Sequence, residues 1–277
     1  MKGSPVENFR AWTHEDSRLG MQTTQLAPVQ PLHLNVGQVP MSLYISEETL
    51  WQKALMRYQE FIGGPWEGLK VVLQDRPCDS RSKAGFFYKL DDASISLRDS
   101  GAEFYGVRHE YALDSLLRIL LTTVLLPERG FLLHAASVVR DGQAHIFFGR
   151  SGAGKSTISS LSPKGSVLTD EISLLRYSGG AWQAYGTPFW GEFRADGINR
   201  RYPIAGIYSL IQASEDRVVP VPPKEIVRAL LPCVLFFNSE PKANDALLQT
   251  IVGFARQVPC YRLHFRRDAS FWEVIPQ

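Results

Sequence analysis

The chain has 277 residues, which is enough for one large domain or two smaller ones with a buried core. Hydrophobic residues make up 44% of it and charged residues 21%, both ordinary for a soluble globular protein. The 30 basic and 28 acidic side chains leave a formal net charge of +2, so the composition gives no argument for binding nucleic acid or an anionic membrane.

Cysteine usage and hydropathy favour a cytoplasmic protein. Cys78, Cys233 and Cys260 are odd in number and lie far apart, which argues against a disulfide framework and against a zinc site. No run of about 18 apolar residues occurs, so no membrane span is expected. The first twenty or so residues lack the apolar centre of a secretory signal.

Residues 1–40 are polar and without a sustained period, so we expect them to be largely unstructured or extended. A small α+β module is expected over residues 41–126. Its predicted elements are a helix within residues 43–63 with Ser46 as N-cap, short strands across residues 69–110, and a strongly apolar helix over Tyr111–Leu126.

Residues 127–277 predict an α/β domain with a mixed sheet. The domain is expected to open with two strands joined by the hairpin turn Asp141-Gly142. The predicted strands are Phe131–Arg140, Ala144–Phe148, Val167–Asp170, Ile172–Tyr177, Trp182–Tyr185, Ile207–Gln212, Tyr261–Phe265 and Phe271–Ile275, and the predicted helices are Lys224–Leu231 and Asn244–Gln257.

The segment that follows the second of these strands is a phosphate-binding loop. It reads GRSGAGKS from Gly149 to Ser156 and matches G-x-x-x-x-G-K-[ST] at every fixed position. Glycines let consecutive N–H groups point at one anion, Lys155 reaches the β and γ phosphates, and the Ser156 hydroxyl can bind Mg²⁺. The residues expected to contact the nucleotide are Gly149, Ser151, Gly152, Ala153, Gly154, Lys155, Ser156 and Thr157.

An acid and a histidine accompany the loop. Asp170 ends an apolar run 21 residues after Gly149, which is the length of one helix and one strand, so it is expected at the carboxyl edge of the sheet as a second metal ligand. His134 interrupts the apolar strand FLLHAASVV. It is expected either as a hydrogen-bonded core residue or as a group that binds metal or assists proton transfer.

The order of these residues resembles the kinase domain of the HPr kinase/phosphorylase family, whose fold is shared with ATP-dependent phosphoenolpyruvate carboxykinase. The resemblance covers about Leu125–Val274 and is carried by LLHAASVVRDGQAHIFFGRSGAGKST, VLTDEISLL and AYGTPFWGEF. It implies an ATP-binding loop, with His134 and Asp170 at the metal and the transferred phosphate. It also implies that an arginine just before Tyr-Pro-Ile, Arg200 or Arg201, contacts phosphate.

Two positions depart from the pattern of that family. Thr157 stands where a glutamate usually follows the loop, and Thr169-Asp170 stands where two aspartates are usual. The second acid is then Glu171, as in the carboxykinase Asp-Asp-Glu. This leaves Asp170 or Glu171 as the base that would deprotonate an acceptor hydroxyl.

These observations predict an ATP-dependent, Mg²⁺-using kinase with Asp170, His134, Glu171 and Arg201 as its catalytic residues. The acceptor would be a Ser-like hydroxyl on a protein, a peptide or a small molecule. The alternative is an ATP-binding regulatory or scaffold protein with little turnover. A motor-type P-loop ATPase would need a second long strand ending in an acid pair, which we do not find. Related kinases form rings, so a homo-oligomer is possible.

Overall fold

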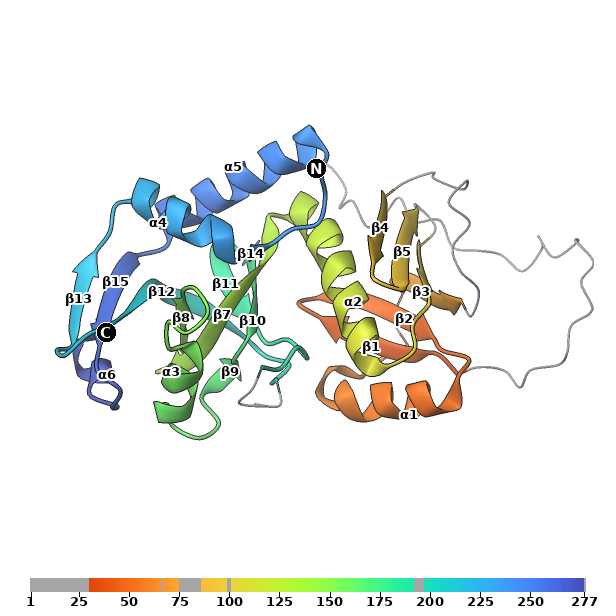
Figure 1. Cartoon of the computed structure of the whole chain (residues 1–277), viewed down its shortest axis with the longest axis horizontal. Coiled ribbons are helices and arrows are strands. Elements are labelled where there is room, and N and C mark those ends of the chain that lie inside the picture. Colours follow the sequence, from red (N-terminus) through yellow and green to blue (C-terminus); the bar gives the residue numbers. More distant parts are fainter. Residues whose placement is uncertain (1–29, 66, 75–85, 99–100, 192–196, 277) are drawn as a thin grey trace, which may run out of the picture. The chain divides into compact units, whose positions relative to one another are not determined.

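The structure is a computed structural model that describes residues 30–65, 67–74, 86–98, 101–191 and 197–276. Residues 1–29 of the predicted segment 1–40, and Cys78, lie outside the described residues. The described chain divides into two compact units, residues 30–35 with 39–116 and residues 36–38 with 117–276. Figure 1 shows the elements of both units. Within the described residues, every helix is too short or too polar to span a lipid bilayer.

The first unit is built on a six-stranded mixed sheet with the strand order β1-β2-β3-β6-β5-β4. Strands β2, β3 and β6 are parallel, whereas β6, β5 and β4 are antiparallel. The elements are β1 (Leu32–Val36), β2 (Val39–Tyr44), α1 (Glu48–Arg57), η2 (Gln59–Phe61), β3 (Leu69–Gln74), β4 (Phe86–Leu90), β5 (Ala93–Arg98), β6 (Gly101–Tyr105) and the start of α2 (Glu110–Leu125).

Strand β1 and the start of β2 lie inside the segment for which the sequence predicted little regular structure. Leu32, Leu34 and Val36 are buried and alternate with half-buried residues. A period of two is typical of a strand with one buried face. The end of that segment is therefore more regular than expected.

Helix α1 begins at a different cap from the predicted one. The carboxylate of Glu47, not the hydroxyl of Ser46, accepts hydrogen bonds from the N–H groups of Thr49 and Leu50, at 2.8 and 2.6 Å. A carboxylate can accept both bonds at once and carries a charge that favours the amino end of a helix. The prediction of Ser46 as N-cap is wrong for this reason.

The second unit is built on a nine-stranded mixed sheet with the main order β11-β10-β7-β8-β12-β15-β13, and both β9 and β14 pair with β7. This arrangement confirms the predicted α/β class with a mixed sheet. The elements after α2 are η3 (Leu126–Glu128), β7 (Gly130–Arg140), β8 (Gln143–Phe148), α3 (Lys155–Leu161), β9 (Val167–Thr169), β10 (Ile172–Ser178), β11 (Ala181–Tyr185), β12 (Arg201–Gln212), β13 (Arg217–Pro220), α4 (Pro223–Leu230), η4 (Leu231–Cys233), β14 (Val234–Leu235), α5 (Pro241–Gln257), β15 (Cys260–Phe265) and α6 (Phe271–Val274).

Two long strands change partners along their length. The first half of β7 pairs with β10 and its second half with β8, while the first half of β12 pairs with β11 and its second half with β8 and β15. Strands β8, β12 and β15 run parallel to one another. Their carboxyl ends therefore meet at one edge of the sheet.

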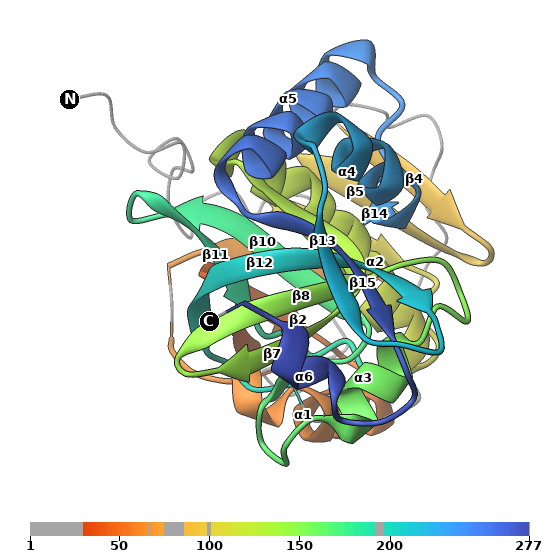
Figure 2. The same cartoon turned by 90° about the vertical axis from the view of Figure 1, so that its left-hand side faces the viewer.

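Alternating side chains of these strands form two cores, one on each face of the sheet. Ile146 and Phe148 of β8 pack in the core that includes residues of α4 and α5. Phe147, between them, packs in the core that includes residues of α3 and α6. Figure 2 shows these two pairs of helices on opposite sides of the strands.

The closing segment Phe271–Ile275 is not the predicted strand, because Phe271–Val274 forms a helix, α6. Phe271 and Ile275 are buried, but Glu273 between them is exposed. In a strand, residues two apart share a face, so Glu273 would be buried with its neighbours. The short strands β13 and β14 were not predicted.

Candidate functional site

The glycine-rich loop lies at the edge of the sheet where parallel strands end. It leaves β8 at Gly149, beside the second half of β12, where Ser209 pairs with Phe148. Lys155 begins α3 directly after it. In open α/β sheets, ligands bind outside the carboxyl ends of the parallel strands. The fold therefore presents this loop where a ligand is expected.

Two glycines of the loop adopt a backbone conformation that other residues rarely adopt. Gly152 has a φ of 78° and Gly154 a φ of 109°. A Cβ atom on Gly154 would also lie 2.5 Å from Cζ of Phe265, at the end of β15. Glycine is therefore required at position 154 both by φ and by the close approach of a buried ring.

Hydrogen bonds hold the loop against the sheet edge. The N–H of Ala153 donates to the carbonyl oxygen of Arg150, at 3.0 Å. Nε2 of Gln212, the last residue of β12, donates to the carbonyl oxygen of Gly152, at 2.8 Å. Arg267 in turn donates to Oε1 of Gln212, at 3.0 Å. The loop is thus braced from the neighbouring strand.

The ammonium of Lys155 turns back toward the start of the loop. Its Nζ donates to the carbonyl oxygen of Gly149, at 3.0 Å, with that of Arg150 at 3.5 Å. The side chain is buried, and burial lowers its pKa, while the negative charge of Glu171 acts in the opposite direction. Because burial removes water from around this cation, binding of an anion would stabilise its charged form.

His134 lies on β7 and interacts electrostatically with this lysine. The ring is half-buried, and burial lowers its pKa, with the positive charges of Lys155 and Arg118 adding to the effect. The imidazole is therefore neutral at neutral pH, with a lone pair that can accept a proton or a hydrogen bond. His134 pairs across the sheet with Ile172, the second residue after Asp170.

The two acids, Asp170 and Glu171, directly follow β9, at the end of the strand where the sequence predicted Asp170. Asp170 is buried and its Oδ1 accepts a hydrogen bond from the N–H of Gly191, at 3.0 Å. The carboxylate of Glu171 forms a salt bridge with Arg118 of α2, at 3.7 Å. Electrostatic interactions with Lys155 link both Glu171 and His134 to the loop.

The hydroxyls of the loop remain accessible. Ser151 and Ser156 are exposed, and Thr157 is half-buried at the start of α3. Thr169, which stands where a second aspartate was expected from the resemblance, is buried and donates its hydroxyl hydrogen to the carbonyl oxygen of Ile172, at 3.1 Å. The side chain of Thr169 is therefore engaged with the backbone and does not replace the missing carboxylate.

The structure does not bring Arg200 or Arg201 to the loop by any described contact. Both side chains are exposed, and Arg201 opens β12, where it pairs with Tyr185. The part of β12 that borders the loop is its other end, at Gln212. Arg118 is the arginine that a described contact places beside Glu171.

A sequence family described as "SynChlorMet cassette protein ScmC" matches residues 112–277, which is more than half of the chain. The chain belongs to the ScmC family. The match begins inside α2 and includes the loop, both acids, His134 and Arg118.

Other comparisons are weaker. No curated protein matches the sequence significantly. Among solved structures, this ScmC-family chain is similar to the Hpr(Ser) kinase/phosphatase from Coxiella burnetii, at 13% identity and a TM-score of 0.26. The alignment covers 45% of this chain and 89% of that chain. A score this low does not establish a shared fold.

The residues around Lys155 fit a phosphate-bearing ligand. Nε of Arg118 is buried and has no hydrogen-bond partner among the described residues. An unpaired buried donor is costly, and a phosphate oxygen would satisfy it. Within the described part of the chain, no group of three His, Cys, Asp or Glu side chains could hold a metal ion by itself. Mg²⁺ needs no such group, because it binds through one or two carboxylates together with phosphates and water.

Sequence reasoning missed several residues that shape this site. Arg118 was hidden in an apolar helix, although a lone charge in the run LLRILL is itself a usable signal. Gly191, Gln212 and Phe265 reach the loop or Asp170 only through the tertiary fold. Nothing in their local sequence distinguishes them.

Proposed function

We propose that this ScmC-family chain is an ATP-dependent kinase that acts in the cytoplasm and phosphorylates a hydroxyl group. The observation that carries the proposal is the convergence of chemically distinct groups on one buried ammonium. Lys155 contacts the first residues of the loop and interacts electrostatically with Glu171 and His134. Phosphoryl transfer uses cations that stabilise phosphate charge and a carboxylate that accepts the acceptor proton, and a neutral imidazole can take part in proton transfer.

The loop would hold the triphosphate of ATP. Its N–H groups and the Lys155 ammonium would bind the β and γ phosphates, after Lys155 exchanges the carbonyl oxygen of Gly149 for a phosphate oxygen. Ser156 and Asp170 would hold Mg²⁺, which when bound neutralises charge on the phosphates. Gly191 would fix the orientation of Asp170 through the N–H that it donates.

In the transfer step, the hydroxyl oxygen of the acceptor attacks the γ-phosphorus and forms a new P–O bond. The bond from that phosphorus to the oxygen that bridges it to the β-phosphate breaks, and ADP leaves with that oxygen. The acceptor proton passes to a carboxylate, Asp170 or Glu171. Arg118 and Lys155 would stabilise the charge that develops on the transferred group. His134, whose ring is neutral at neutral pH, would lie beside the transferred group and could accept a hydrogen bond through its unprotonated ring nitrogen.

A second candidate function is an ATP-binding regulatory or scaffold protein with little turnover. The buried hydroxyl of Thr169 favours it, because this position contributes a hydrogen bond to the backbone where a kinase of the resembled family has an acid. In this function the loop would bind ATP and a partner would respond to the bound state. Phosphoryl transfer would be absent.

Transfer of ³²P from γ-labelled ATP tests the two candidates. Glycerol, glycerol 3-phosphate, malate, free serine and a short serine-containing peptide serve as acceptors, with Mg²⁺ present. We expect a labelled product with the wild type, its loss in Asp170→Asn, and no change in Asp245→Asn, an exposed position on α5. Nucleotide binding without labelled product from any acceptor would favour the regulatory function. Equal labelling by wild type and Asp170→Asn would overturn the assigned role of Asp170.

A further inference from the structure

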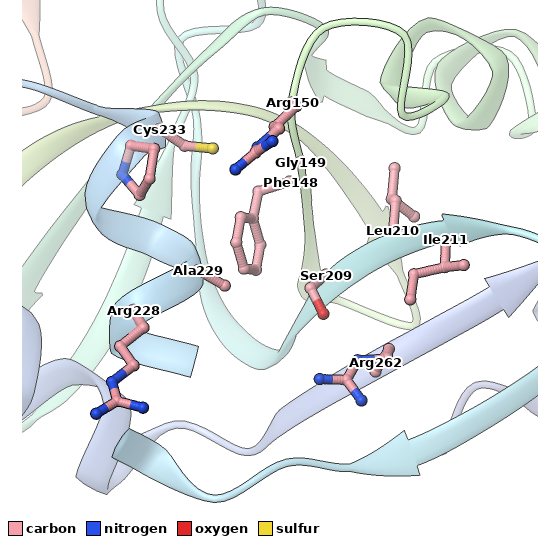
Figure 3. A pocket seen from close by; sticks show the side chains of 11 residues that line it. Phe148, Gly149, Arg150, Ser209, Leu210, Ile211, Arg228, Ala229, Cys233 and Arg262 are labelled. Carbon is pink, nitrogen blue, oxygen red and sulfur yellow. The ribbon is translucent and has the colours of Figure 1, made fainter. Parts of the chain in front are cut away.

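A cavity of about 290 Å³ opens beside the first residues of the loop. Its walls come from the ends of β8 and β12, from β15 and from α4 with η4 (Figure 3). The polar side chains that line it are Arg150, Ser209, Arg228, Cys233 and Arg262. The cavity lies at the edge where the parallel strands β8, β12 and β15 end. In open α/β sheets, ligands bind outside the carboxyl ends of parallel strands.

The cavity begins where the terminal phosphate of a bound nucleotide is expected. Lys155, whose counterpart in such loops reaches the β and γ phosphates, donates to the carbonyl oxygens of Gly149 and Arg150. These same two residues line the cavity. A molecule in the cavity would therefore lie next to the phosphoryl group to be transferred.

The positively charged side chains that line the cavity favour an anionic ligand. Three arginines line it and no aspartate or glutamate does. Arg262 forms a salt bridge with Glu225, at 3.5 Å. Among the described residues, no carboxylate forms a salt bridge with Arg150 or Arg228. A guanidinium binds carboxylate and phosphate groups with paired hydrogen bonds.

We propose that this cavity binds the acceptor, and that the acceptor is a small hydroxyl-bearing molecule with a carboxylate or phosphate group held by Arg228 and Arg262. The inference rests on the proposed kinase function and names the substrate class of that site. The volume of about 290 Å³ is just below the range of small-molecule pockets, about 300 to 1,000 Å³, so the occupant must be small. It suits a hydroxy acid or a phosphorylated polyol.

Calorimetric titration tests the occupant. Malate and glycerol 3-phosphate serve as the carboxylate and phosphate probes, and glycerol as the neutral comparator. Each is titrated into the full chain, with and without a saturating non-hydrolysable ATP analogue and Mg²⁺. The variants are Arg228→Gln and Arg262→Gln, with Arg256→Gln on α5 as an exposed control outside the cavity. Thermal unfolding of every variant verifies that it is folded.

We expect at least one anionic probe to bind the wild type and the control in the presence of the analogue, with glycerol much weaker. Arg228→Gln and Arg262→Gln should each weaken the anion about tenfold while leaving the affinity for the analogue unchanged. Unchanged anion binding in both variants would overturn the inference and leave the kinase function standing. Parallel loss of analogue binding would assign the cavity to the nucleotide instead.

Two further outcomes separate this inference from the function on which it rests. If the wild type binds no ATP analogue, the proposed function fails, and arginine-dependent anion binding in nucleotide-free protein would mark the cavity as an anion site of another kind. If neither probe binds but an acidic serine-containing peptide does so through Arg228 and Arg262, the small-molecule occupant is wrong.

Discussion

The ammonium of Lys155 donates a hydrogen bond to the carbonyl oxygen of Gly149, and the two atoms lie 3.0 Å apart. The lysine therefore satisfies a backbone carbonyl at the start of the loop that it ends. A bound triphosphate would take over the ammonium and release that carbonyl. The same side chain would therefore stabilise the loop in the absence of nucleotide and bind phosphate in its presence.

Replacement of Lys155 tests this relationship. We expect Lys155→Met to weaken binding of an ATP analogue by about 10- to 100-fold, because hydrogen bonds to charged groups contribute roughly 1.5 to 3 kcal/mol. The free energy of unfolding should change by less than about 1 kcal/mol, because loss of the hydrogen bond is offset by removal of a desolvated charge. Lys164→Met, at an exposed position after α3, is the matched control. Equal affinities in the two variants would contradict the assigned role.

Gly154 is expected to tolerate no side chain. Gly154→Ala should destabilise the protein by about 1 to 3 kcal/mol, because φ is 109° and the new Cβ would meet Phe265 at 2.5 Å. Gly152→Ala shares the positive φ but meets no atom within 4 Å, so it should cost less. Urea denaturation of both variants, and of Gly154→Ala combined with Phe265→Leu, measures the contact. The idea fails if the cost at Gly154 does not exceed that at Gly152.

Arg118 and Arg201 are expected to differ in their effect on phosphoryl transfer. Arg118→Met should lower kcat by about 100-fold or more, with a smaller change in KM, because the guanidinium would act on charge that develops during transfer. Arg201→Met should change kcat less than about twofold, because its side chain is exposed and contacts no described loop residue. Steady-state kinetics on both variants decide between the arginine chosen by resemblance and the one chosen by geometry. A larger loss in Arg201→Met would reverse the assignment.

The buried ring of His145 is expected to make the protein less stable in mild acid. Burial lowers its pKa from 6.5 to about 4, with the positive charge of Arg140 adding to the effect, and its Nδ1 lies 3.3 Å from the hydroxyl of Tyr208. The unfolded chain therefore takes up this proton at a higher pH than the folded chain does. Stability contributed by the neutral ring is complete above about pH 6.5 and is lost as the pH falls toward 4.

The expected difference for His145 between about pH 7.5 and about pH 4.5 is roughly 2 to 3 kcal/mol. Urea denaturation of the wild type and of His145→Gln at both pH values measures it, because the variant lacks this titration but keeps all others. His264→Gln, at a more accessible position on β15, should change the pH dependence much less. Parallel pH profiles for the wild type and His145→Gln would refute the prediction.

The sequence was sufficient for those parts of the fold that depend on local patterns. The apolar helix that became α2, the hairpin of β7 and β8, and the strand, loop and helix around Lys155 all follow from periodicity and from residue types that permit few conformations. It failed at Phe271–Ile275, where five residues are too few to separate a helical turn from a strand without knowing that Glu273 is exposed.

The site divides in the same way. The order of His134, the loop and Asp170 could be read from the chain, because each residue type carries its chemistry and the spacing matches whole elements. Which arginine accompanies them, and that Arg228 and Arg262 line one cavity with Arg150, only the tertiary structure decided. These residues come from α2, α4 and β15. Their places in the site depend on how these elements, distant in the chain, pack in the tertiary fold, which no local pattern encodes.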